Sequence, residues 1–199
     1  MKKIIISAAV LVLSTFSANA IDMGKFSLTA GLSANQSVFG ATAKEQNFDE
    51  AGTIRKTSKE SGVFTDGYGS QFIELGIGQY VSFGYEASDT ISTPQNVSKE
   101  NMAAQATVSV DFENLTSTYA KINFPNGVFA KYGMTSVDLN IKETMLSGST
   151  YKDKSTDGTA LSVGYQTYIG DSGFGLRIEG AYLEFDGVST DNGVATGAG

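Results

Sequence analysis

The chain of 199 residues contains no cysteine, no histidine and no tryptophan, and it has only two prolines. Without cysteine there is no disulfide, thiol nucleophile, iron–sulfur cluster or thiolate zinc site. Without histidine there is no Ser-His-Asp triad, histidine general base or imidazole metal ligand. Only carboxylates, lysine, serine and tyrosine are left for catalysis. We therefore expect a protein that is not an enzyme and that uses no cofactor or metal.

The charge balance is acidic. Lysine and arginine total 14, aspartate and glutamate total 21, and the formal net charge is −7. A protein that follows the phosphates of a nucleic acid needs a basic face. We therefore expect no nucleic-acid partner.

The first twenty residues have the layout of a secretory signal peptide. A short basic start, Met1 to Lys3, precedes an apolar run from Ile4 to Leu13, and Ala18-Asn19-Ala20 matches an A-x-A cleavage site. The apolar run is well short of the roughly 20 residues that a membrane-spanning helix needs. The sequence predicts that the protein is exported and cleaved after Ala20. The mature domain would then consist of residues 21–199.

The mature chain alternates apolar and polar residues with the period of β-strands. One run keeps the same parity from Met102 to Phe124, with Leu115 as its main exception, which predicts a single unbroken strand. In the next run the apolar parity changes near Thr135–Ser136, which predicts a bulge there. Seven strands are expected, within residues 25–34, 71–78, 81–86, 102–124, 128–141, 161–166 and 176–182.

The connections between these runs alternate in length. Gly78-Gln79, Pro125 to Gly127, and Gly170 to Gly173 are tight turns, whereas residues 38–67, 88–101 and 143–158 are long and polar. Short turns at one end and long loops at the other are typical of a transmembrane barrel. The sequence thus predicts an all-β, antiparallel, up-and-down transmembrane β-barrel. Its apolar face would meet lipid, and its long loops would form the contact surface.

Two groups of side chains would then have defined places. Aromatic residues beside the tight turns are expected to form an interfacial girdle: Tyr80, Phe124, Phe129, Tyr168 and Phe174. Three acids and three bases fall on the polar parity, and inside a narrow barrel they would have to pair. This predicted interior charge network consists of Glu74, Glu86, Lys121, Lys131, Arg177 and Glu179.

In these features the chain resembles the small outer-membrane β-barrel proteins of the OmpA/OmpX type. The resemblance is carried by the signal peptide, the amphipathic strands that start at Gly24-Lys25-Phe26-Ser27-Leu28, the alternation of turns and loops, and the aromatic spacing. It implies a location in the bacterial outer membrane, a monomer of eight strands, and a structural or adhesive role. Only seven strands follow Ala20, and residues 191–199 form a glycine-rich polar tail. We therefore expect a truncated member that lacks its last strand.

Two other functions fit the same pattern. One is a small porin-like solute conduit, and the other is a soluble, exported, lipocalin-like barrel that binds an apolar ligand. The expected partners of the membrane barrel are outer-membrane lipid and a surface or host molecule at the long loops. Arg55, Lys56 and Lys59 in the first long loop form a small basic spot that suits the anionic groups of lipopolysaccharide.

Overall fold

A computed structural model describes residues 4–22, 25–48, 53–93, 96–100, 104–144, 152–170 and 173–189. This part of the chain is all-β, and every strand pairing in it is antiparallel. None of the described residues belongs to a helix long and apolar enough to cross a membrane. The strands are β1 (Ile4–Asp22), β2 (Phe26–Phe48), β3 (Ile54–Ile77), β4 (Val81–Ser88), β5 (Ile91–Ser92), β6 (Asn96–Glu100), β7 (Ala104–Asn123), β8 (Val128–Thr144), β9 (Lys154–Tyr168) and β10 (Phe174–Phe185).

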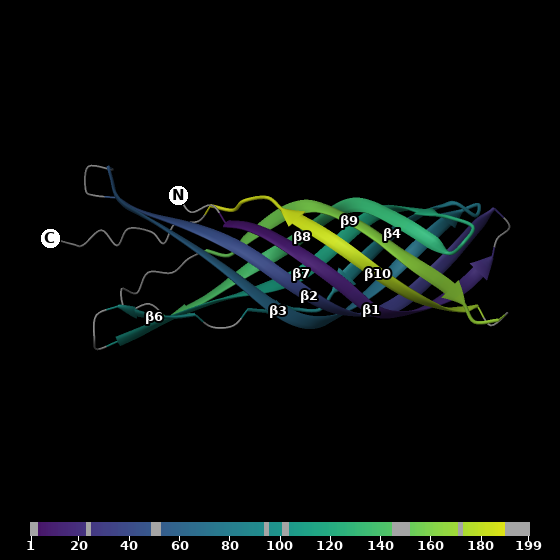
Figure 1. The fold of residues 1–199 in the computed structure, drawn as a ribbon, viewed down its shortest axis with the longest axis horizontal. Coiled ribbons are helices and arrows are strands. Elements are labelled where there is room, and N and C mark those ends of the chain that lie inside the picture. Colours follow the sequence, from purple (N-terminus) through teal and green to yellow (C-terminus); the bar gives the residue numbers. More distant parts are fainter. Residues whose placement is uncertain are drawn as a thin grey trace.

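The strand pairings return to their starting point. The order runs β4-β3-β2-β1-β10-β9-β8-β7, and β4 also pairs with β7. The short strands β5 and β6 both pair with β7. The sheet therefore curls around an interior, and Figure 1 shows the strands tilted around one long axis. The tight turns that follow β3 and β7 lie at the right end of that view. The far ends of β2 and β3 lie at the left end together with β6, and we call this end the long-connection end.

The segment predicted as a signal peptide forms a strand in the full-length chain. β1 pairs with β2 from Ile4 to Asp22 and with β10 from Ser7 to Ala18. It thereby supplies partners for backbone N–H and C=O groups that would otherwise line two open edges. The seven predicted strands correspond to β2, β3, β4, β7, β8, β9 and β10. β1 is the eighth strand of the closed order, and the short strands β5 and β6 are additional. Export and cleavage remain predictions, because a pairing in the full-length chain does not test them.

The tight turns lie where the sequence placed them. Gly78, Gly127, Gly170 and Gly173 have φ angles of 62°, 86°, 56° and 76°, a region that glycine adopts without steric cost. The segments expected to be long loops are different, because strands occupy much of each one. β2 continues to Phe48 and β3 begins at Ile54, so residues 38–67 are largely a hairpin rather than a loop. Residues 88–101 hold β5 and β6.

The predicted bulge lies on a different strand. β8 keeps one buried parity through Thr135, Val137 and Leu139, without interruption at Ser136. The irregularity is on β7, between Glu113 and Thr116, opposite the place where it was expected. β7 therefore does not keep one parity, and the bulge turns Leu115 into the interior with 4% of its surface exposed. The change along β8 is one of interior chemistry, from Lys131 and Thr135 to Val137 and Leu139.

The chemistry of the two faces reverses along the strands. Near the tight turns the outward residues are apolar and the inward residues are polar, and the other end has the opposite arrangement. Toward the long connections the interior holds an apolar layer made of Phe39, Ile91, Phe112, Leu115, Val137, Leu139, Leu183 and Phe185. Most outward positions beside this layer are polar, as with Ser136, Asp138 and Asn140 on β8 and Glu184 on β10. Val38 and Val63, next to Phe39 and Phe64, are exposed apolar exceptions.

Glycines on neighbouring strands make room for two interior aromatic rings. A Cβ atom on Gly164 would lie 2.4 Å from Cζ of Phe129, and one on Gly84 would lie 2.4 Å from Cζ of Tyr119. By contrast, a Cβ atom on Gly180 would meet no atom within 4 Å. The interior rings thus depend on the absence of a side chain at Gly164 and Gly84.

Gly164→Ala is therefore expected to lower the free energy of unfolding by about 1–3 kcal/mol, the usual cost of overpacking a filled interior. Gly180→Ala is the matched control, and its unfolding free energy should not fall. Urea unfolding of the refolded full-length chain, followed by circular dichroism, measures both variants. Equal stability of the two alanine variants would contradict the described packing of Phe129.

Asn114 in the β7 bulge lowers the pKa of Asp138, which lies outside the apolar outer surface. Asn114 has a φ angle of 52°, and its amide nitrogen donates to Oδ2 of Asp138 at 2.8 Å. Ser155 donates to Oδ1 of the same carboxylate at 2.7 Å. The hydrogen bonds from Asn114 and Ser155 lower the pKa of Asp138 below its ordinary value. A lowered pKa stabilises the fold above the unfolded-state value of about 3.9. This contribution is lost as pH falls through the folded-state value.

Asn114→Gly keeps a residue that tolerates positive φ but removes one donor to Asp138. We expect the pKa of Asp138 to rise toward its ordinary value, so that its stabilising contribution is lost at a higher pH during acidification. Titration of the carboxyl ¹³C resonances measures this. Asp111 is an internal control, because the hydrogen bond from Lys142 is the main cause of its lowered pKa. An unchanged Asp138 titration would show that the Asn114 hydrogen bond does not matter.

Candidate functional site

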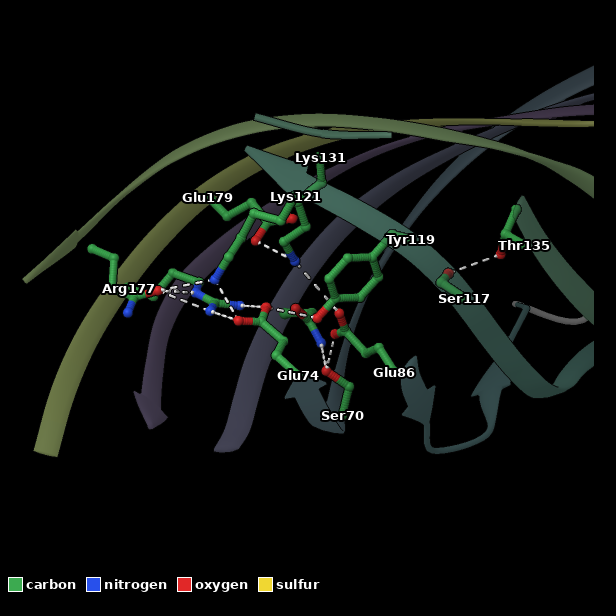
Figure 2. A network of polar contacts seen from close by, with 12 residues as sticks. Ser70, Glu74, Glu86, Ser117, Tyr119, Lys121, Lys131, Thr135, Arg177 and Glu179 are labelled. Carbon is green, nitrogen blue, oxygen red and sulfur yellow. Dashed lines mark hydrogen bonds and ion pairs between the residues drawn. The ribbon is translucent and has the colours of Figure 1, made fainter. Parts of the chain in front are cut away.

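The polar half of the interior is the candidate site. Alternate residues of β3, β4, β7, β8 and β10 point into it, and all six charged residues predicted from parity meet there (Figure 2). Glu74, Lys121 and Arg177 are each 2% exposed, and Lys131 and Glu179 are also buried. Glu86 is half-buried.

Glu74 is the centre of the first cluster. Arg177 approaches it from β10 with both terminal nitrogens, at 2.8 Å from Oε2 and 2.8 Å from Oε1. Lys121 contacts Oε2, and the hydroxyl of Tyr119 donates to Oε1 at 2.8 Å. The side-chain oxygen of Gln166 accepts from Nη2 of Arg177 at 2.9 Å. This bidentate arrangement fixes the guanidinium plane and gives every charged group in the cluster a partner.

Lys131 is the centre of the second cluster. Its Nζ lies 2.7 Å from Oε2 of Glu179 and 3.8 Å from Oε2 of Glu86. The hydroxyl of Ser70 donates to Glu86 and accepts a 3.0 Å hydrogen bond from the amide of Asn35. One ammonium group thus faces two carboxylates in this cluster, whereas one carboxylate faces two cations in the first.

Aromatic rings lie between the cations of the two clusters. The Tyr119 ring centroid is 4.4 Å from Nζ of Lys131, and the Phe72 centroid is 4.5 Å from Cζ of Arg177. The Phe129 centroid lies 5.1 Å from Cζ of Arg177 and 5.4 Å from Nζ of Lys121. These are cation–π distances. Each cation therefore contacts both a carboxylate and the face of an aromatic ring.

Phe129 is a correction to the predicted girdle. It is 1% exposed and lies in the interior, because it alternates with the outward positions of Val128 and Ala130 on β8. Its nearness to a turn suggested an interfacial position, but its parity determines its face. The other four residues predicted for the girdle, Tyr80, Phe124, Tyr168 and Phe174, are exposed on the described structure.

Six side chains of the site were not among the residues predicted for the charge network: Asn35, Ser70, Phe72, Tyr119, Phe129 and Gln166. Tyr119, Phe129 and Phe72 share the parity of a network charge on their own strands, and Gln166 shares the parity of the inward residues Ser162 and Gly164 on β9. That parity was a usable signal for each of them. A selection by charge alone does not include the rings and the amide that contact the charges.

The arrangement fills space and neutralises charge. Its three carboxylates balance its three cations, and buried charges need such partners because burial costs several kcal/mol per ion. Among the described residues, no group of three or more aspartate or glutamate side chains is placed to hold a metal ion. The carboxylates of the site face cations, so none of them is left as an unpaired base.

No protein-family model and no curated protein matches the chain. A solved structure of the Salmonella SPI-1 type III secretion injectisome secretin InvG (residues 176 to the end, open gate state) is similar at 8% sequence identity with a TM-score of 0.17. The alignment covers 99% of this chain, and the chain spans 63% of the length of that one. A similarity of this size carries no argument about fold or function.

Removal of the Glu74 carboxylate should be strongly destabilising. In Glu74→Gln, Lys121 and Arg177 remain buried without their counter-charge, and breaking a buried pair in this way typically costs about 3–5 kcal/mol. Glu184→Gln is the control, because Glu184 is exposed on the outward side of β10. Urea midpoints of the refolded chains provide the comparison. A midpoint for Glu74→Gln that equals that of Glu184→Gln would show that the network contributes nothing to stability.

Proposed function

We propose that this protein is a non-enzymatic β-barrel of the bacterial outer membrane, with a structural or surface-interaction role at its long-connection end. The observation that carries the proposal is the reversal of polarity along the strands. The apolar outer face and the charged interior occupy the same half of the molecule. The apolar interior layer and a mostly polar outer face occupy the other half.

Each half fits a different solvent. In water, apolar side chains are buried inside and polar ones cover the surface, as in the half near the long connections. In lipid, the outward residues are apolar and the inward ones polar, as in the half near the tight turns. A barrel fully immersed in water has no physical reason to expose the outward side chains of that second half. Those exposed by more than half include Phe83, Ile122, Tyr132, Met134, Leu161, Val163 and Ile178.

Aromatic side chains border the apolar outer surface on both sides. Tyr80, Phe124, Tyr168 and Phe174 lie beside the tight turns, and Tyr85, Tyr132 and Tyr182 are exposed farther along their strands. Phe174 and Tyr182 are eight residues apart on β10. At about 3.3 Å per residue and a tilt of about 40°, they are separated by about 20 Å along the barrel axis. This is close to the apolar height of roughly 25 Å in outer-membrane barrels.

The part beyond this apolar surface supports a role in contacts outside the membrane. β2 and β3 pair as far as Phe48 and Ile54, and β5 and β6 add further strand at the same end. This end carries most of the polar outer positions. The sequence of β3 also includes Arg55, Lys56 and Lys59, whose side chains lie outside the described part of the structure. A surface molecule or lipopolysaccharide is the proposed class of partner there.

The interior argues against the alternative of a solute conduit. The two charged clusters cross the polar half, and the apolar layer fills the other half with stacked rings. The Phe39 centroid lies 4.9 Å from that of Phe64 and 5.7 Å from that of Phe112. An eight-stranded barrel is just wide enough for its own side chains to fill it. A solute would therefore have to displace both the ion pairs and the rings.

Val163→Arg tests the membrane proposal against the soluble lipocalin-like alternative. Val163 is 61% exposed near the middle of the apolar outer surface, and a cation there should cost about 2–4 kcal/mol if that surface meets lipid. Thr159→Arg is the matched control, since Thr159 points outward on the same strand beside Glu184. Insertion into phospholipid vesicles, measured by heat-modifiable gel migration, should fall for Val163→Arg only. Equal insertion of both variants, or a fully folded chain in buffer without lipid or detergent, would overturn the proposal.

A further inference from the structure

The strand β1 occupies a place between β2 and β10 that a cleaved chain would leave empty. β1 pairs with β2 from Ile4 to Asp22 and with β10 from Ser7 to Ala18 (Figure 1). Almost all of β1 precedes the cleavage site predicted after Ala20. Removal of residues 1–20 would expose backbone N–H and C=O groups along two facing strand edges, and such edges bind further strands. We call this place the β1 slot.

The edges of β2 and β10 are poorly suited to close on each other. Both strands are antiparallel to β1 and therefore run in the same direction, whereas every described pairing of the sheet is antiparallel. Across the slot they are separated by two strand spacings, about 9–10 Å. Direct pairing would narrow an interior that side chains such as Arg177 and Phe129 already fill. The slot therefore needs a strand that runs antiparallel to both of its edges.

The interior side of the slot excludes charge. The six charged residues of the two clusters lie on β3, β4, β7, β8 and β10, and they balance three against three without a residue of β1. Arg177 and Glu179 are buried on the β10 edge, and β1 has Thr15 and Val12 at their register positions. A charged residue at either position would have no counter-charge left, and burying such a charge is costly.

Other register positions of the slot require apolar residues. Near the long-connection end the two edges hold Phe39 and Leu183 of the apolar layer, and β1 has Ala8 at their register position. Nearer the tight turns the edges hold the exposed Leu32 and Leu176, and β1 has Phe16 there. An occupant thus has to follow the same reversal of polarity as its neighbours. Residues 4–21 meet this condition and include no charged residue.

We propose that the β1 slot is an acceptor site for one β-strand of another polypeptide once residues 1–20 have been removed. The occupant is an extended segment that is small and apolar beside Phe39 and Leu183, neutral and polar beside Arg177, and apolar beside Leu32 and Leu176. It lies antiparallel to β2 and β10 and provides partners for the backbone groups of both edges. The inference rests on the cleavage predicted from the sequence, and it is independent of what the long-connection end binds.

A cut full-length chain tests the slot. A recognition sequence for a site-specific protease is inserted between Gly24 and Lys25, after β1 ends and before β2 begins. The chain is refolded in detergent, cut, unfolded in urea, and refolded with an excess of a labelled synthetic peptide of residues 4–22. We expect the label to migrate with the folded barrel in an unheated gel and to leave it on boiling.

Three results of this experiment would overturn the proposal. A folded barrel that contains neither the label nor the cut segment would show that β2 and β10 close on each other. A folded species of twice the mass without the label would show that a second copy closes the sheet instead. Failure of the cut chain to refold with the peptide, when the uncut chain refolds in the same detergent, would show that a separate strand cannot enter.

Two peptide variants test the chemistry of the slot. Thr15→Lys places a cation at the register position of the buried Arg177, and its incorporation should fall by about tenfold or more. Ser7→Lys is the matched control, since its register position is that of the exposed Glu184, and it should enter as well as the unmodified peptide. Equal incorporation of the two variants would contradict the exclusion of charge.

A further peptide tests whether the site accepts a strand of another polypeptide. Its sequence is unrelated to that of residues 4–22, but it keeps neutral residues at the inward register positions and apolar residues beside Leu32 and Leu176. We expect it to displace the labelled peptide of residues 4–22 during refolding. A scrambled peptide of the same composition should not do so. If both unrelated peptides fail, the slot is specific for residues 4–22 and the proposal is wrong.

Discussion

Burial of charged side chains inside a closed set of strand pairings is the constraint on which the rest of this structure depends. Arg177 on β10, Glu74 on β3 and Lys121 on β7 come from distant parts of the chain, and they meet only because the strands curl round to face one another. Leaving any one of them without its partners would cost several kcal/mol. The ion pairs therefore favour one arrangement of strands over alternatives in which the same apolar faces are covered equally well.

The same constraint explains the small residues of the interior. Arg177 contacts Glu74, Gln166 and the face of Phe72. These contacts need neighbouring aromatic rings that lie close against the inner surface of the sheet. Phe129 can do so because Gly164 beside it has no side chain, and Tyr119 can do so because of Gly84. Large interior groups and interior glycines are thus two parts of one packing arrangement. A change in either alters the environment of the cations.

Much of this was predictable from alternation alone, because a period of two is a local property of the sequence. The six charges and their common face follow from parity on single strands, as do the tight turns at Gly78 and Gly127.

Alternation fails where position depends on a neighbouring strand. The bulge between Glu113 and Thr116 changes the parity of β7, and its signal in the sequence is only Leu115. Residues 38–67 look like a loop because they are polar, yet Phe39 and Phe64 stack inside and extend both strands. Pairing of Ile4–Asp22 depends on the edges of β2 and β10, which no local pattern reveals.

The bulge and the reversal of polarity have a common consequence. Ahead of the bulge, the inward positions of β7 include Phe112, and after it they include Tyr119 and Lys121. One extra residue therefore lets a single strand contribute an apolar side chain to one interior layer and charged side chains to the next. On β8 the same transition needs no bulge, because the residue types change while the parity is constant. On both strands, the interior changes from apolar to charged side chains at the same height along the barrel. The outer face changes from polar to apolar side chains at that height as well. A boundary shared in this way fixes how deeply a membrane would surround the molecule, because moving the barrel in either direction would bring Asp138 and Asn140 into lipid or expose Tyr132 to water.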